Sequence, residues 1–152
     1  MQRVPIRRSL LVLLVLAALC GVSCSGGKPC YPVRGKVFVN GKPAEGVTVV
    51  FHATGDPEEN PVQPSAVVGA DGSFTLKSYF VKDRLLKDGA PAGKYKVTCV
   101  WYPADLQKHL AQEKLPDKLG GRYNDPKTSG LHADVLEKDN DLPPFELKAP
   151  DK

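Results

Sequence analysis

The stretch KYKVTCVWY, Lys94–Tyr102, indicates the fold more clearly than any other segment of this 152-residue chain. Its apolar residues recur at every second position and would share one face of an extended strand: Tyr95, Val97, Cys99 and Trp101. Because successive side chains on a β-strand point to opposite faces, this period of two predicts a strand with one face in a core. Cys99 belongs to that face, so we expect it to be buried.

Short apolar segments separated by turn residues continue this pattern on both sides of the strand. They are Val33–Val39, Val47–Ala53, Ser65–Ala70, Ser73–Phe80, Leu131–Glu137 and Pro144–Lys148. Asn40-Gly41 and Asp71-Gly72 predict tight hairpin turns, because these residue types tolerate positive φ angles. The remaining segments predict loops at Lys82–Gly93 and Leu119–Gly130, a turn at Lys138–Pro143 and one short helix at Ala104–Glu113. About seven short strands with frequent turns predict an all-β fold, an antiparallel β-sandwich.

The composition fits one globular domain and argues against nucleic-acid binding. The apolar fraction is 41%, enough for a core, and Gly and Pro number 14 each, which is typical of a chain with many turns. Of the 21 Lys and Arg residues, three lie in residues 1–23, so the remainder carries 18 basic and 17 acidic side chains. A nucleic-acid-binding domain keeps a basic stripe in its folded part, so we expect no nucleic-acid partner.

Residues 1–23 have the organisation of an export signal. A short basic segment with three arginines precedes the apolar run LLVLLVLAALC, Leu10–Cys20, and small residues follow it. As a helix, the run would span roughly 16 Å, about half of the ~30 Å hydrocarbon core of a bilayer. An export signal therefore explains the segment better than a transmembrane helix. Arg7-Arg8 offers only weak support for a twin-arginine route.

Ser23-Cys24 resembles the processing site of a bacterial lipoprotein, in which a small residue precedes the cysteine that receives the lipid. Gly21 departs from that pattern, which prefers an aliphatic residue there. Cys20 is a less suitable alternative because bulky Leu19 precedes it, and cleavage without lipidation is another. The resemblance implies a signal peptide over residues 1–23 and lipidation of Cys24. A tether over residues 24–30 would then lead to the β-sandwich domain that the strand pattern predicts over residues 31–149. The resemblance also implies localisation to a bacterial cell membrane or outer membrane, facing the periplasm or the exterior.

Cys30 and Cys99 remain if Cys20 is removed with the signal and Cys24 is lipidated. Exported proteins meet an oxidising environment, so a disulfide between Cys30 and Cys99 is one expectation. The bond would close a loop of about 70 residues and contribute roughly 4 kcal/mol through loop entropy. The alternative is two free thiols, with Cys99 a small core residue. Neither cysteine belongs to a C-x-x-C motif or lies near a histidine in sequence, so we expect no zinc site.

Several segments together resemble the carboxypeptidase regulatory-like, transthyretin-like sandwich domains. VRGKVFVNGKPAEGVTVVFHA has their G-x-V, G-K-P and V-x-F elements, GADGSFTL has D-G-x-F-x-L, and DGAPAGKYKVTCVW has G-x-P-x-G-x-Y-x-V. GRYNDPKTSGLHADV and NDLPPFEL resemble the C-terminal part of small bacterial lipoproteins that carry this domain. The expected core residues are Phe51, Phe74, Leu76, Tyr95 and Val97, and the expected positive-φ glycines are Gly41, Gly72 and Gly93. The resemblance implies an accessory or interaction module, since fold does not fix function.

No segment of the sequence predicts an active site. Ser129, His132 and Asp134 lie close together, but Ser129 lacks a nucleophile-elbow motif, so a solvated strand face explains them better. The widely spaced histidines (His52, His109 and His132) do not indicate a metal site, and the acidic turn Asp139–Asp141 lacks the glycine and distal glutamate of an EF-hand loop. The C-terminal KAPDK also lacks the tyrosine-arginine-glycine-serine ending of the related hydroxyisourate hydrolases. We therefore expect no catalysis, no metal and no other cofactor.

Tyr102 and Tyr123, with Trp101 beside them, are the candidate ligand-binding residues. Exposed aromatic rings beside loops stack on sugar rings, whereas the alternative places Trp101 in the core and uses Tyr123 to anchor the long loop. Two functions therefore stay open. One is a lipid-anchored structural or protein-interaction role with an unknown envelope protein as partner. The other is a carbohydrate- or small-ligand-binding module at the cell surface.

Overall fold

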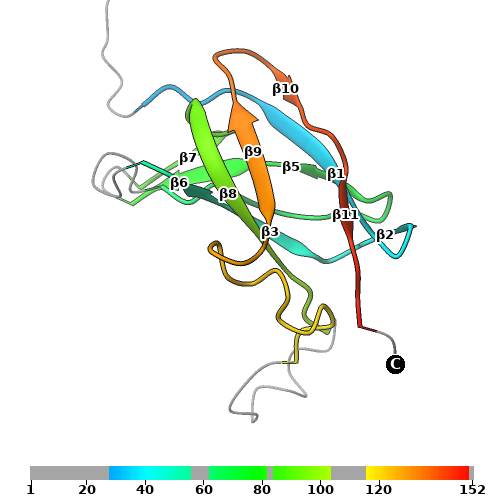
Figure 1. Cartoon of the computed structure of the whole chain (residues 1–152). Coiled ribbons are helices and arrows are strands. Elements are labelled where there is room, and N and C mark those ends of the chain that lie inside the picture. The colour runs from blue at the N-terminus through cyan, green and yellow to red at the C-terminus, as the bar shows by residue number, and fades with distance from the viewer. Residues whose placement is uncertain (1–27, 56–61, 82–83, 104–115, 151–152) are drawn as a thin grey trace, which may run out of the picture.

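Two packed β-sheets make up the protein (Figure 1). The computed structural model describes residues 28–55, 62–81, 84–103 and 116–150. The expected all-β sandwich is confirmed, with eleven strands in these ranges, several of only two or three residues. The described residues contain no helix, and thus none long and apolar enough to cross a membrane. The helix expected at Ala104–Glu113 lies outside the described residues.

The first sheet is built around β1, Val33–Val39, which has the bounds that the sequence predicts. On one side β1 pairs in antiparallel orientation with β2 (Lys42–Pro43) and β5 (Ser73–Thr75). On the other side it pairs in parallel orientation with β10 (Asn140–Asp141) and β11 (Phe145–Leu147). The last strands of the chain therefore lie beside the first.

The second sheet has the order β7-β6-β4-β3-β8-β9, and every neighbouring pair is antiparallel. Its strands are β3 (Thr48–Ala53), β4 (Ser65–Val67), β6 (Lys77–Phe80), β7 (Leu85–Asp88), β8 (Gly93–Val100) and β9 (Leu131–Val135). β8, the strand that KYKVTCVWY predicts, is the longest and pairs with β3 from Thr48↔Val100 to Ala53↔Tyr95. It lies between β3 and the edge strand β9.

The core lies between the two sheets and contains all five residues expected there. Phe51, Phe74, Leu76, Tyr95 and Val97 are each at most 3% exposed. The Phe51 and Tyr95 rings meet at 5.6 Å between centroids, and the Phe74 ring stacks on Phe145 at 6.2 Å. Burying one such side chain contributes about 1.5–3 kcal/mol, so the alternating residues of β3 and β8 supply much of the stability of the fold.

The expected strand Ser73–Phe80 is in fact two strands, β5 in the first sheet and β6 in the second. The chain changes sheets at Leu76, which is fully buried. Phe74, Leu76, Ser78 and Phe80 are all buried, so the alternation of inward and outward side chains continues through the change of sheet. Because both sheets face one core, the period of two does not reveal which neighbours the strand pairs with.

Two expected connections contain strands. The segment predicted as the loop Lys82–Gly93 includes β7, and the turn Lys138–Pro143 includes β10. β7 is an edge strand with the sequence LLKD, and Leu85 and Leu86 are both exposed. Its residues do not alternate between apolar and polar, so sequence periodicity gives no strand signal. Backbone pairing with β6, from Lys77↔Asp88 to Phe80↔Leu85, defines this strand instead.

Both turn dipeptides contain the expected positive-φ glycine, but only one dipeptide joins paired strands. Asn40 (φ 50°) and Gly41 (φ 75°) form the β1–β2 hairpin. Gly72 (φ 82°) and Asp71 instead join β4 of the second sheet to β5 of the first, which corrects the expected hairpin. The Asp71 carboxylate accepts hydrogen bonds from the Ser73 hydroxyl (2.6 Å) and backbone N–H (3.0 Å), which lower its pKa.

Candidate functional site

The predicted signal peptide, Cys20, the lipidation site Cys24 and the start of the tether all fall in residues 1–27, outside the described residues. The chain then meets the domain at Tyr31. The Tyr31 N–H donates to the Ala90 carbonyl (2.8 Å), and the Ala90 N–H donates back to the Tyr31 carbonyl (3.0 Å). This isolated bridge fixes the entry of the chain immediately after β7.

Gly89 is what lets the entering backbone come so close. Its φ is +87°, and a Cβ atom added to it would lie 1.9 Å from the Tyr31 carbonyl oxygen. No real Cβ tolerates that distance, so a side chain at position 89 would displace the Tyr31 backbone. Gly89 therefore connects the path of the tether to the β6–β7 hairpin.

Cys30 and Cys99 are both free thiols in the structure, so the expected disulfide is not formed there. Cys30 lies near Ser78, Lys87 and Tyr95, at the start of β8. Cys99 lies four residues beyond Tyr95 on the same strand, a distance of about 13 Å at ~3.3 Å per residue. Bonded cysteines have Cβ atoms about 3.8 Å apart. Cys30 lies beside the start of β8 and Cys99 lies near its end, so the two thiols are too far apart to form a disulfide.

Neither described thiol has the electrostatics of a nucleophile. Burial, together with the charge of Asp117, raises the pKa of Cys99 to about 12. Burial also raises the pKa of Cys30, although a hydrogen bond with Ser78 and the positive charge of Lys87 act in the opposite direction. Because the thiolate is the reactive form, both cysteines are expected to be unreactive at neutral pH.

Ser129, His132 and Asp134 do not assemble into a catalytic chain. His132 and Asp134 are exposed on the same face of β9, as expected, whereas Ser129 is buried and its hydroxyl lies 3.4 Å from the Leu131 N–H that donates to it. The Asp134 carboxylate faces the Lys94 ammonium at 3.8 Å. Within the described ranges no hydrogen bond joins His132 to Ser129 or Asp134. The polar strand face explains His132 and Asp134, and Ser129 is a buried residue that accepts a backbone hydrogen bond just before β9.

The other polar candidates have structural partners. His52 Nε2 lies 2.9 Å from the Thr98 hydroxyl across the β3–β8 pair, and burial lowers its pKa. His109 lies outside the described residues. The described ranges contain no group of three or more potential metal ligands. In the acidic turn, Asp139 faces Arg34 at 3.7 Å, and the Asn140 side chain binds backbone atoms.

The Asn140 side chain makes several hydrogen bonds to backbone groups, a role that the sequence analysis did not predict. Its side-chain oxygen accepts from the Leu136 N–H at 2.8 Å, and its amide donates to the carbonyls of Leu136, Lys138 and Pro32. Pro32 lies 108 residues away in sequence. An asparagine in a turn is expected to make hydrogen bonds with nearby backbone groups. Nothing in the local sequence predicts that Asn140 also binds Pro32, in the segment before β1.

Asp117 has the same role at the other end of β8. Its carboxylate accepts from the N–H groups of Trp101 (2.9 Å), Leu119 (3.0 Å) and Gly121 (3.0 Å). These three bonds fold the start of the long connection onto the end of the strand. Asp117 was not a candidate in the sequence, because only its position before the glycine pair hints at a turn.

The two candidate tyrosines differ in their surroundings. Tyr123 packs against the core, and its hydroxyl accepts from the Lys148 N–H at 3.1 Å, so it anchors the long connection. Trp101 also packs against the core, and the Lys118 ammonium lies over its ring, 4.7 Å from the ring centroid. Tyr102 is 40% exposed. Of the aromatic pair considered for ligand stacking, Tyr102 is the exposed residue and Tyr123 is half-buried.

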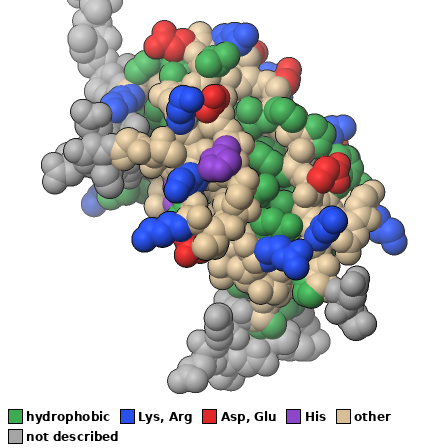
Figure 2. Space-filling model, viewed as in Figure 1, with side chains coloured by type: hydrophobic (Ala, Val, Ile, Leu, Met, Phe, Trp, Pro, Cys, Tyr) green, Lys and Arg blue, Asp and Glu red, His purple; other side chains and the backbone are tan. Residues whose placement is uncertain are grey.

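Two apolar surfaces were not anticipated. One is a shallow groove between edge strand β9 and the segment before β11, lined by His132, Asp134, Leu142, Pro144 and Phe145; Figure 2 shows apolar side chains exposed in this strip. The other is the hairpin patch, which we define as Tyr79, Val81, Leu85 and Leu86 at the turn end of the β6–β7 hairpin.

Comparison with models of known protein families and with curated proteins finds no match to this sequence.

Proposed function

We propose that the chain is a lipid-anchored β-sandwich protein of the bacterial cell envelope, with a structural or protein-interaction role and no catalysis of its own. The observation that carries the proposal is Ser23-Cys24, placed directly after a basic segment and an apolar run. Each buried CH₂ of an attached acyl chain contributes about 0.8 kcal/mol, so two or three chains give a durable anchor.

The path of the chain supports this proposal. Tyr31 already pairs with Ala90, and β1 begins at Val33. Only six residues separate Cys24 from Tyr31. A lipid on Cys24 would therefore hold the sandwich close to the membrane, as expected for a domain that meets partners at the envelope.

The surroundings of the candidate catalytic groups support a non-catalytic role. Ser129 is buried, Asp134 is paired with Lys94, and Cys99 has a raised pKa. Resemblance to the carboxypeptidase regulatory-like domains stays a prediction, and it points in the same direction, since such domains are mostly interaction modules.

The alternative proposal is a carbohydrate- or small-ligand-binding module. Its supporting observation is the exposed ring of Tyr102. It is weaker than the sequence suggested, because Tyr123, the second residue of the expected platform, is used to pack the long connection. Glycan binding that disappears in Tyr102→Ala would favour this alternative.

The proposed anchor is tested by substituting single cysteines in the full chain. Cys24→Ser is expected to remove metabolic label from radioactive palmitate and to move the protein from the membrane to the soluble fraction. Cys20→Ser is the matched control, and it should keep both label and location. A Cys24→Ser protein that stays labelled on the membrane contradicts the proposal. The partner is then sought by crosslinking in native envelopes.

A further inference from the structure

The hairpin patch brings together exposed apolar side chains to which the proposed anchor assigns no role. Tyr79 and Leu86 are directly opposite each other in the β6–β7 ladder and are 50% and 56% exposed. Directly opposed residues of paired strands project from the same face, so these two form one surface. Val81, at the end of β6, is 70% exposed. Large apolar residues grouped on a surface indicate an interaction site.

The path of the N-terminal segment relates this patch to the predicted lipid. Cys30 lies against the face of the hairpin opposite Tyr79 and Leu86, where Ser78 and Lys87 act on its thiol, and Tyr31 bridges to Ala90 just after β7. In Figure 1 the described N-terminal end and the turn end of the β6–β7 hairpin leave the molecule on the same side. The seven Cα–Cα steps from Cys24 to Tyr31 span at most about 25 Å, so a lipid on Cys24 keeps this side within that distance of the bilayer.

The charges around the patch suit an anionic surface. The described residues of the hairpin carry three basic side chains, Lys77, Arg84 and Lys87, and one acidic side chain, Asp88. Lys77 pairs with Asp88 at 3.8 Å. Lys87 is opposite Ser78, on the other face of the hairpin, where its ammonium lies 5.0 Å from the centroid of the buried Phe80 ring. Arg84 is therefore the excess charge beside the apolar residues, and a basic side chain flanking an apolar surface favours binding to anionic headgroups.

We propose that the hairpin patch is a second membrane contact, in which Tyr79, Val81 and Leu86 enter the interfacial layer of the bilayer and Arg84 faces anionic headgroups. This inference rests on the proposed anchor, because the lipid on Cys24 supplies the proximity. Tyrosine suits that layer, since its ring is apolar and its hydroxyl is polar. The contact would fix how the sandwich is oriented on the membrane.

Tryptophan fluorescence tests the contact in the full lipidated protein, reconstituted into phosphatidylcholine–phosphatidylglycerol vesicles with brominated acyl chains. The chain has a single native tryptophan, Trp101, at the far end of β8 from Tyr31. In Tyr79→Trp we expect a new emission component that shifts to the blue and is quenched by the brominated chains. The matched control is Tyr102→Trp, a similarly exposed tyrosine at the other end, which should show neither effect.

The outcomes separate this proposal from the anchor. If Cys24→Ser leaves the membrane while the lipidated Tyr79→Trp protein is not quenched, the anchor stands and the contact is wrong. Emission of Tyr79→Trp that responds to soluble glycans or to an envelope protein, and not to vesicles, also overturns the contact. If Cys24→Ser stays labelled on the membrane, the anchor itself is wrong.

The electrostatic part has its own measurement. In the Cys24→Ser chain, weak binding to anionic vesicles is expected to remain, and Arg84→Gln should lower its partition coefficient about fivefold, the effect of one basic residue at an anionic surface. Lys94→Gln, which removes a basic residue on β8 outside the patch, is the control and should change it much less. Equal losses in the two variants would contradict a contact through the hairpin.

Discussion

Replacing Gly89 with alanine is expected to separate the entering chain from the sandwich. Gly89 has a φ of +87°, a left-handed conformation that costs an L-residue about 1–2 kcal/mol. In addition, the new Cβ would lie 1.9 Å from the Tyr31 carbonyl oxygen and 2.4 Å from its carbon. The backbone of Tyr31 therefore has to move, and the two hydrogen bonds of the Tyr31–Ala90 bridge are lost.

The magnitude follows from these two effects. Each hydrogen bond contributes about 0.5–1.5 kcal/mol net, so the bridge contributes roughly 1–3 kcal/mol. With the conformational penalty, Gly89→Ala is expected to lower the free energy of unfolding by about 2–5 kcal/mol. For a urea m-value of about 2 kcal/mol/M, the unfolding midpoint falls by roughly 1–2.5 M.

Gly41→Ala is the matched control for this substitution. Gly41 has a similar φ of +75°, but nothing lies within 4 Å of an added Cβ. It should show only the conformational penalty, about 1–2 kcal/mol. Urea unfolding of both variants in the Cys24→Ser chain measures the difference, and amide hydrogen exchange at Tyr31 and Ala90 shows whether the bridge opens. Equal losses of stability, with both amides still protected in Gly89→Ala, would refute this reasoning.

Three further predictions follow from the described residues. Cys99, buried and with a pKa of about 12, is expected to resist thiol reagents until the protein unfolds, and non-reducing peptide mass spectrometry should find no Cys30–Cys99 peptide. Asn140→Ala is expected to lower the free energy of unfolding by about 1–3 kcal/mol, because it leaves backbone groups unpaired, whereas exposed Asp141→Ala should change it little. His52 has a pKa lowered from 6.5 by burial, so the folded state binds fewer protons than the unfolded one. Stability should fall as the pH drops through 6.5, and it should fall less in His52→Gln when both are followed by urea unfolding.

The main strands of the core were predictable because apolar side chains recur at every second position along them. β1 has the predicted bounds, and β8 and the five expected core residues lie where a period of two places them. The same rule failed at Leu76, because the inward alternation continues from β5 into β6 while the backbone partners change. Side-chain periodicity describes which face is buried, and it contains no information about which sheet a strand joins.

Predictions about sites failed where they depended on contacts between segments distant in sequence. Cys30 and Cys99 suggested a disulfide because they were the two cysteines left over. The Tyr31–Ala90 bridge, however, places Cys30 beside the start of β8, whereas Cys99 lies near the end of that strand. Asn140 shows the same limit, since its partner Pro32 is 108 residues away. The lipid site at Cys24 depends on local sequence only, and it stays a prediction because it lies outside the described residues.

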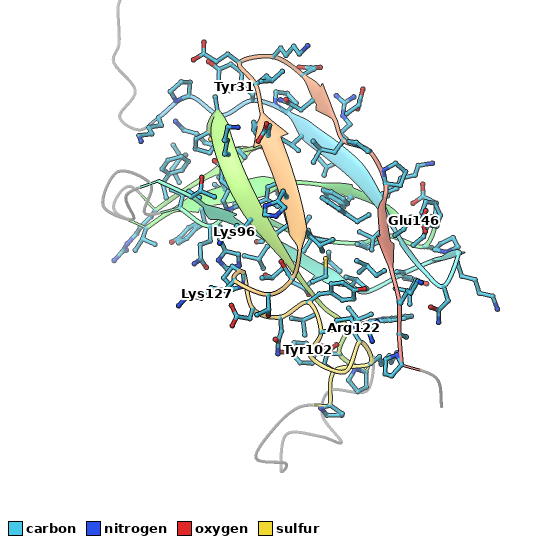
Figure 3. All side chains as sticks on the ribbon, viewed as in Figure 1. Tyr31, Lys96, Tyr102, Arg122, Lys127 and Glu146 are labelled. Carbon is cyan, nitrogen blue, oxygen red and sulfur yellow. The ribbon has the colours of Figure 1, made fainter. Side chains whose placement is uncertain are left out.

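The sandwich has two distinct ends, and under the proposed anchor one end would face the membrane and the other would face away from it. Figure 3 shows Tyr31 at one end of the molecule and Tyr102 at the other. Tyr31, Gly89 and the hairpin patch belong to the end where the tether enters, while Tyr102 and the turns organised by Asp117 belong to the opposite end. If the tether end lies on the bilayer, the exposed ring of Tyr102 points away from it. The proposed contact of the hairpin patch with the membrane would therefore leave the Tyr102 end as the surface that an envelope protein or a glycan would reach.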